Sequence, residues 1–137
     1  MGAAVGAQLG RPDQRVLAIL GDGGFAFGMQ AVWTASHYGI PVTWLVLDNR
    51  GYRSMRRAVD VRSREQTSTK PDFGFDFVLD IGQIARGMGA QASRVSDPDE
   101  LADAVRAAMA DDRPHVVEVQ ISPAIEFVKS HGPPMAV

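Results

Sequence analysis

One stretch, residues 16–49, constrains the fold of this 137-residue chain more than any other. It opens with five apolar residues, Val16–Leu20, which are short enough to form one buried strand and stop at the glycine-rich sequence Gly21–Gly24. In Phe25–Tyr38, apolar residues recur at spacings of three and four, which is typical of a helix. A second apolar run, Val42–Leu47, follows. The stretch therefore predicts a strand, a glycine turn, a helix and a strand, in a parallel sheet covered on both faces.

The rest of the chain extends this pattern. A capping box formed by Asp80 and Gln83 predicts the start of a helix, and Asp97 with Pro98 predicts another. The further elements that we expect are helices at residues 1–10, 52–57, 81–88 and from 98 onward, strands at 90–95 and 115–121, and a long loop at 59–75. Alternation in the last strand predicts an edge strand with Glu118 exposed. The expected fold is α/β: a Rossmann-like, three-layer domain with a mostly parallel sheet and helices on both faces.

Composition narrows the class of protein. With 45% hydrophobic residues, the chain is long enough to bury the core of one globular domain. The net charge of −2 gives no electrostatic case for binding nucleic acid or a membrane. The chain has no cysteine, which excludes disulfides and thiolate metal sites. No secretory or membrane-spanning run is present, so we expect a cytoplasmic protein.

Polar residues follow the two central strands where each of them ends. Asp22 comes directly after the first strand, and Asp48 and Asn49 end the second. The glycine-rich turn offers backbone N–H groups at a helix N-terminus, which favours a phosphate, but a carboxylate within that turn would repel it. A divalent cation removes the repulsion, because Asp22, Asn49 and phosphate oxygens can share one hard ion. The stretch therefore predicts a pyrophosphate bridged by Mg²⁺.

Gly21-Asp22-Gly23, followed after 25 residues by Asn49, resembles the diphosphate-binding motif of enzymes that use thiamine diphosphate (ThDP). Two neighbouring segments, residues 31–35 (AVWTA) and 48–52 (DNRGY), look most like those of the benzoylformate decarboxylase and acetolactate synthase group of 2-oxo acid enzymes. Many members of that group carry Ser at the position of Gly24 and a second Asn at that of Asp48. One hydroxyl contact to phosphate is therefore absent here.

The resemblance implies a role for each matching residue. Asp22 and Asn49 would be side-chain ligands of Mg²⁺, and Gly51 would supply a backbone carbonyl. Gly23 and Gly24 would donate backbone N–H groups to the diphosphate, next to Gly21, and the Tyr52 region would close over it. The implied cofactors are thiamine diphosphate and Mg²⁺, and the implied reaction is decarboxylation or carboligation of a 2-oxo acid. No residue of this chain is assigned to proton transfer.

The resemblance also implies a domain organisation. Residues 1–122 would form the C-terminal diphosphate-binding domain, incomplete at its N-terminus, and residues 123–137 would form a tail. The pyrimidine-binding domain or subunit, which activates the cofactor in that family, is not within these residues. We therefore expect weak or absent cofactor binding and no decarboxylase activity from the chain alone, an exposed apolar face, and a homo-oligomer.

Three other interpretations of the chain, and two of one basic segment, remain open at this point. The glycines also weakly favour an NAD-type fingerprint. Two features count against it: the third glycine of the fingerprint is missing, and Asp22 lies where the phosphate would approach. A hydrolase that uses Asp22 and Asp48 would need further carboxylates for a second metal. The chain could also be a non-catalytic or truncated binding module. Seven of the 14 basic residues lie within positions 50–70, and form either an electropositive mouth for anionic substrates or a solvated or interface surface.

Overall fold

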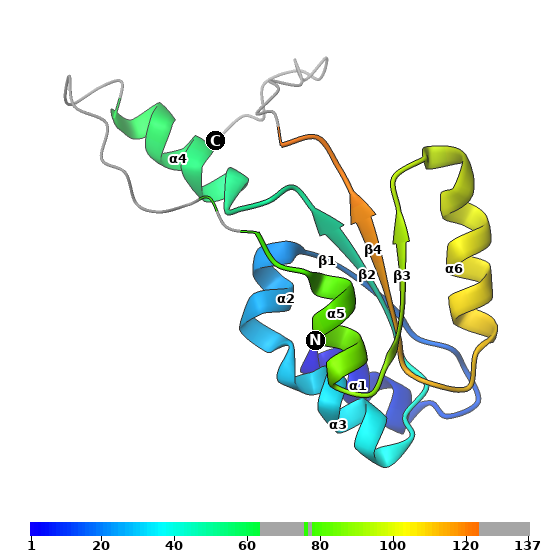
Figure 1. Ribbon diagram of the computed structural model, residues 1–137. Coiled ribbons are helices and arrows are strands. Elements are labelled where there is room, and N and C mark those ends of the chain that lie inside the picture. Colours follow the sequence, from blue (N-terminus) through cyan, green and yellow to red (C-terminus); the bar gives the residue numbers. More distant parts are fainter. Residues whose placement is uncertain (64–75, 77, 124–137) are drawn as a thin grey trace, which may run out of the picture.

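The computed structural model describes residues 1–63, 76 and 78–123, and these form an α/β domain around one parallel sheet (Figure 1). Its strands are β1 (Leu17–Gly21), β2 (Thr43–Asp48), β3 (Gln91–Val95) and β4 (His115–Gln120). They are ordered β1-β2-β4-β3, and all three pairs are parallel. All carboxyl ends therefore lie at one edge of the sheet.

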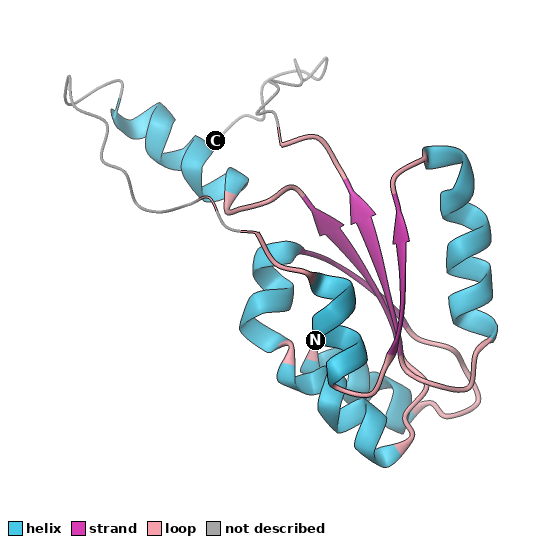
Figure 2. Cartoon of the chain, in the orientation of Figure 1, coloured by secondary structure: helices cyan, strands magenta, loops and turns pink. Residues whose placement is uncertain are grey.

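Helices cover both faces of the sheet (Figure 2). One face carries α1 (Gly2–Gly10), α2 (Asp22–Gly28), α3 (Gln30–Tyr38) and α5 (Ile81–Gly87). The other carries α6 (Leu101–Ala110), which follows the short 3₁₀ helix η1 (Pro98–Glu100). Trp44, Phe25 and Ile81 are fully buried in the larger core, and Val117 and Ala108 in the smaller. The predicted three-layer, mostly parallel fold is confirmed.

Local signals placed several element ends correctly. Asp80 accepts hydrogen bonds from the backbone N–H of Gln83 and from its side chain, both at 2.9 Å, which confirms the capping box. Gly39 ends α3 in the left-handed region, with φ of 62°. The side chain of Asp97 accepts from the N–H of Asp99 and caps η1. The predicted domain boundary at residue 122 is untested, and the predicted tail lies almost wholly outside the described residues.

Two predictions about the first crossover are wrong. No glycine turn separates β1 from the helix, because Gly21 ends the strand and α2 begins at Asp22. The single predicted helix is also two helices, α2 and α3, that meet at Met29. A Cβ atom on Gly28 would lie 2.7 Å from Cβ of Met1, so the start of α1 packs directly against this junction. The helix break thus coincides with a tertiary contact that no local pattern reveals.

The prediction for the last strand is wrong as well. β4 lies between β2 and β3, so it is a central strand, and Glu118 is only 1% exposed. Its carboxylate forms an ion pair with Nε of Arg94 at 2.9 Å, and its Oε2 accepts hydrogen bonds from Nη2 of Arg94 at 3.2 Å and from the backbone N–H of Gly82 at 3.1 Å. A buried carboxylate needs such partners, since desolvation is otherwise costly. Glu118 therefore fastens α5 and β3 to the centre of the sheet.

The segment after the second strand is more helical than expected. Helix α4 (Arg53–Ser63) replaces both the short helix predicted at 52–57 and the first part of the predicted loop. In Figure 1 it projects from the carboxyl edge of the sheet. The remainder of that predicted loop, residues 64–75, lies outside the described residues. Among the described helices, none has the length and apolar character needed to span a membrane.

Candidate functional site

The parallel pairing of β1 with β2 brings the predicted site residues together. Gly21 pairs with Leu47, so Asp22 and Asn49 both follow strand ends at the same edge. A cavity of about 370 Å³ lies there. Its lining includes every predicted cofactor residue, namely Gly21, Asp22, Gly23, Gly24, Asn49, Gly51 and Tyr52. Residues that are 25 or more positions apart in the chain thus face one cavity.

Asp22 is buried and holds the two sides of the cavity together. Its Oδ1 accepts from the N–H of Gly23 at 2.8 Å, and its Oδ2 accepts from the N–H of Gly51 at 2.9 Å. Charge-assisted hydrogen bonds of this kind are the strong ones. At the first position of α2, its charge is also favourable for the helix dipole. Donation from Gly23 to a diphosphate would compete with the existing bond to Asp22.

Asn49 contributes the clearest sign of a missing ligand. Its Oδ1 is buried, and it has no hydrogen-bond partner among the described residues. A buried acceptor without a partner carries a desolvation cost of about 1–3 kcal/mol. An oxygen-binding cation in the cavity would satisfy it, and Asp22 would supply the negative charge. The donor set therefore fits Mg²⁺, although the described residues include no cluster of three or more His, Cys, Asp or Glu side chains.

The loop after β2 has an unusual backbone. Arg50 has φ of 61° and Gly51 has φ of 149°, both in the region that L side chains rarely adopt. The carboxylate of Asp48 accepts from the N–H of Arg50 at 3.0 Å, which supports this turn. Asp48 itself is not among the residues that line the cavity. The carbonyl of Gly51 accepts from the N–H of Arg53 at 3.0 Å and retains a second lone pair.

Aromatic side chains form the wall opposite the strand ends. The ring of Tyr52 packs against Gly23 so closely that a Cβ there would lie 2.5 Å from the ring. The ring of Phe27 is tilted against that of Tyr52, with centroids 6.1 Å apart. A Cβ on Gly24 would meet only Leu20, at 3.5 Å, an ordinary contact. The structure therefore requires glycine at position 23 but not at position 24.

Three residues of the cavity were not predicted: Phe27, Arg53 and Ser54. Phe27 lies on α2, five positions after Asp22, and its side chain is exposed, so the pattern of apolar residues did not mark it as part of a site. Arg53 was one of seven basic residues and was not distinguished from them. Together with Arg56 it forms ion pairs with Asp76, whose pKa the hydrogen bond from Arg56 and the two positive charges hold below the usual range. These ion pairs neutralise part of the positive charge that residues 50–70 would need to form an electropositive mouth, one of the two alternatives left open above.

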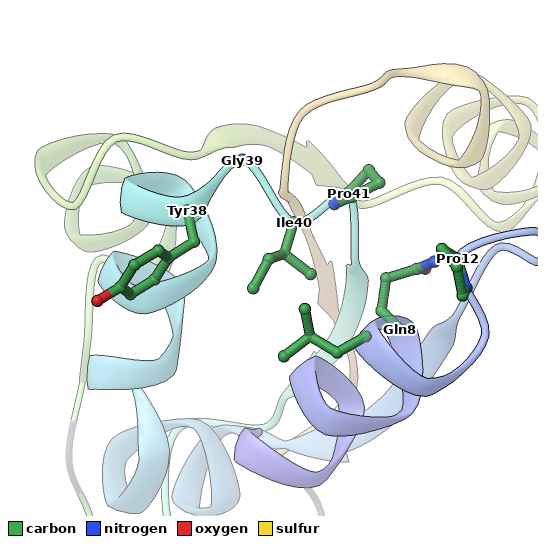
Figure 3. A pocket seen from close by; sticks show the side chains of 7 residues that line it. Gln8, Pro12, Tyr38, Gly39, Ile40 and Pro41 are labelled. Atoms are coloured by element: carbon green, nitrogen blue, oxygen red, sulfur yellow. The ribbon is translucent and has the colours of Figure 1, made fainter.

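Two other cavities lack comparable chemistry. One, of about 220 Å³, lies at the amino edge of the sheet beside the α3–β2 connection (Figure 3). Its one buried polar side chain, Gln8, is satisfied by the backbone of Arg11, Gln14 and Val16. The other, of about 250 Å³, lies at the carboxyl edge between α6 and the sheet and is almost wholly apolar. Neither resembles the site at Asp22 and Asn49.

Comparison with known families decides what kind of domain this is. Residues 1–119 match the family described as "Thiamine pyrophosphate enzyme, C-terminal TPP binding domain". The chain belongs to this family. The cofactor of this family is thiamine diphosphate, also called thiamine pyrophosphate. The family match therefore favours thiamine diphosphate over the NAD of the alternative interpretation.

Individual members of the thiamine pyrophosphate enzyme family resemble the chain over most of its length. Benzoylformate decarboxylase of Pseudomonas aeruginosa is 37% identical over 117 residues, which are 85% of this chain and 21% of that enzyme. A probable acetolactate synthase large subunit of Methanococcus aeolicus is 30% identical over 123 residues, 89% of this chain and 20% of that protein. The resemblance predicted from the two motifs is confirmed.

Solved structures agree with this assignment. The thiamine diphosphate-dependent 4-hydroxybenzoylformate decarboxylase of Rhodococcus jostii RHA1 matches with a TM-score of 0.77 at 33% identity, over 88% of this chain and 22% of that one. Benzoylformate decarboxylase from Polynucleobacter necessarius matches with a TM-score of 0.78 at 25% identity, over 90% of this chain and 23% of that one. The chain therefore spans about a fifth of the length of its relatives.

Proposed function

We propose that this chain binds the diphosphate of thiamine diphosphate through Mg²⁺ in the cavity between β1 and β2. Asp22 and Asn49 would be side-chain ligands of the ion, and Gly51 a backbone ligand. Gly24, and Gly23 once Asp22 turns to the metal, would donate N–H groups to phosphate. The observation that carries this proposal is the buried, unpartnered Oδ1 of Asn49, a residue that lines the same cavity as Asp22.

A metal-binding measurement tests the assignment of ligands. Mn²⁺ substitutes for Mg²⁺ and is counted by electron paramagnetic resonance in the presence of thiamine diphosphate. We expect weak binding by the chain, at least tenfold weaker binding by Asp22→Asn and Asn49→Leu, and no change for Asp13→Asn. Asp13 is an exposed aspartate that pairs with Arg11, away from the cavity. Unchanged Mn²⁺ affinity in the two site variants would refute the assignment.

We further propose that the chain acts within a 2-oxo acid decarboxylase or carboligase and is inactive alone. When bound, thiamine diphosphate supplies the carbanion chemistry, and this chain binds and orients it. The support is the similarity to benzoylformate decarboxylase and acetolactate synthases, of which the chain spans a fifth. The purified chain with cofactor, Mg²⁺ and either benzoylformate or pyruvate should release no CO₂ above the level without protein. Turnover by the chain alone would contradict this proposal.

We propose that a pyrimidine-binding domain or subunit completes the site. We also propose that the chain associates with copies of itself through β1. β1 is an edge strand, and Ile19 on it is 65% exposed. Sedimentation velocity should show concentration-dependent association that Ile19→Lys reduces. Leu9→Lys is the matched control, because Leu9 on α1 is 64% exposed. A monomer at all concentrations, or equal effects of both variants, would count against association through β1.

A further inference from the structure

We propose that Arg53 is a positioning residue that holds the loop Asn49–Gly51 in the shape required for metal binding. This inference goes beyond the ligand assignment above and rests on it for its functional meaning. Arg53 lines the cavity, but its donors point to the protein itself. It contacts the carbonyl groups of three consecutive residues.

The contacts of Arg53 come from both its backbone and its side chain. Nε donates to the carbonyl of Asn49 at 3.3 Å, and Nη2 donates to that of Arg50 at 3.4 Å. Its backbone N–H donates to the carbonyl of Gly51 at 3.0 Å. The remaining nitrogen, Nη1, is paired with Asp76, which also forms an isolated β-bridge with Gly51. The guanidinium therefore joins both sides of the loop.

The loop needs such support because its backbone is strained. Arg50 is the only described non-glycine residue with positive φ, at 61°. A residue with a Cβ is disfavoured in this region, because the Cβ approaches the following carbonyl oxygen. The opposite side of the loop is held by Asp22, through the N–H of Gly51. If Asp22 turns to a metal ion, Arg53 and Asp76 still hold Gly51 and Asn49, beside the bond from the N–H of Arg50 to Asp48.

The geometry separates this role from direct binding of phosphate. A residue that attracted phosphate by charge alone could be replaced by lysine. A planar guanidinium with a fork of donors can bridge two carbonyls and a carboxylate, whereas the compact ammonium of lysine cannot do so at once. Arg53→Lys is therefore the decisive variant, and Arg53→Ala removes both charge and contacts. Arg106→Ala is the control, since Arg106 lies on α6 and pairs with Asp103.

The test has a readout that needs no cofactor. Amide hydrogen exchange is measured by NMR on the full chain, and the rate at Gly51 is divided by that at Val46 in β2 to remove any global change. Loss of two hydrogen bonds should raise this ratio about tenfold in Arg53→Ala and nearly as much in Arg53→Lys. It should not change in Arg106→Ala. An unchanged ratio in Arg53→Ala, or an unprotected Gly51 amide in the wild type, would overturn the proposal.

The Mn²⁺ titration is then repeated on the same proteins. Affinity should fall several-fold in both Arg53 variants. Faster exchange with unchanged Mn²⁺ affinity would overturn the positioning role. The positioning role would also be overturned if Arg53→Lys kept its Mn²⁺ affinity while Arg53→Ala lost it, because that result would indicate an effect of charge alone. Absence of Mn²⁺ and thiamine diphosphate binding by the wild type would refute the proposed function instead, while the exchange data would still report on the loop.

Discussion

Adjacent glycines in α2 should respond in opposite directions to the same substitution. Replacing Gly24 by alanine adds a methyl group 3.5 Å from Leu20, an ordinary contact, and removes a glycine from a helix. We expect a gain of about 0.5 kcal/mol in the free energy of unfolding, below the interior value because the site is in the first turn. Replacing Gly23 by alanine places the methyl group 2.5 Å from the ring of Tyr52, which must move. Overpacking of this kind costs about 1–3 kcal/mol, so the net loss should be about 1–2 kcal/mol.

Urea denaturation followed by circular dichroism measures both effects. For a domain of this size, with m of about 2 kcal/mol per M, the midpoint should rise by about 0.25 M for Gly24→Ala and fall by about 0.5–1 M for Gly23→Ala. A change in tyrosine fluorescence or ring NMR shifts should accompany only the second variant. Changes of the same sign in both variants would refute the conclusion that Tyr52 packs on Gly23.

Three further predictions concern the buried ion pair of Glu118, the titration of His115 and the binding of cofactor beside Gly24. Arg94→Ala leaves the buried carboxylate of Glu118 without its cation, so the free energy of unfolding measured in urea should fall by about 3 kcal/mol. The double variant Arg94→Ala/Glu118→Gln should recover part of this loss. A loss below about 0.5 kcal/mol in Arg94→Ala would contradict this expectation. Burial lowers the pKa of His115, so the unfolded chain takes up its proton at a higher pH than the folded one, and stability should fall as the pH drops below about 6.5. His115→Gln should weaken that pH dependence in thermal melts, and an unchanged slope would argue against it. Gly24→Ser should bind thiamine diphosphate about tenfold more tightly than Gly24→Ala, because it adds a hydroxyl donor to phosphate, and equal affinities by calorimetry would exclude that contact.

The fold and much of the site follow from local sequence signals. Short apolar runs identified β1 and β2, and the residues at their carboxyl ends identified the cavity, because parallel strands place those ends at one edge. Two of the cofactor residues could be named from their places after strand ends, whereas the roles of Gly23, Gly24, Gly51 and Tyr52 were implied by the family resemblance. The two are Asp22 and Asn49, and both line the cavity.

What was missed depends on contacts between distant segments. Alternation in the last strand is the same for an edge strand and for a central strand with one buried charge, so the burial of Glu118 required the strand order and its partner Arg94. The helix break near Gly28 coincides with a contact to Met1, which is distant in the sequence. Arg53 could not be distinguished from its basic neighbours, because its role depends on carbonyl groups that only the folded loop presents.

The central claim is that a metal ion joins thiamine diphosphate to the cavity between β1 and β2. The most direct test is an NMR titration of the ¹⁵N-labelled chain with thiamine diphosphate, with Mg²⁺ and again with a chelator, at concentrations high enough to detect weak binding. We expect the amides of Gly23, Gly24, Asn49 and Gly51 to shift only when cofactor and Mg²⁺ are both present. The same shifts without Mg²⁺, or shifts confined to residues outside this cavity, would contradict it.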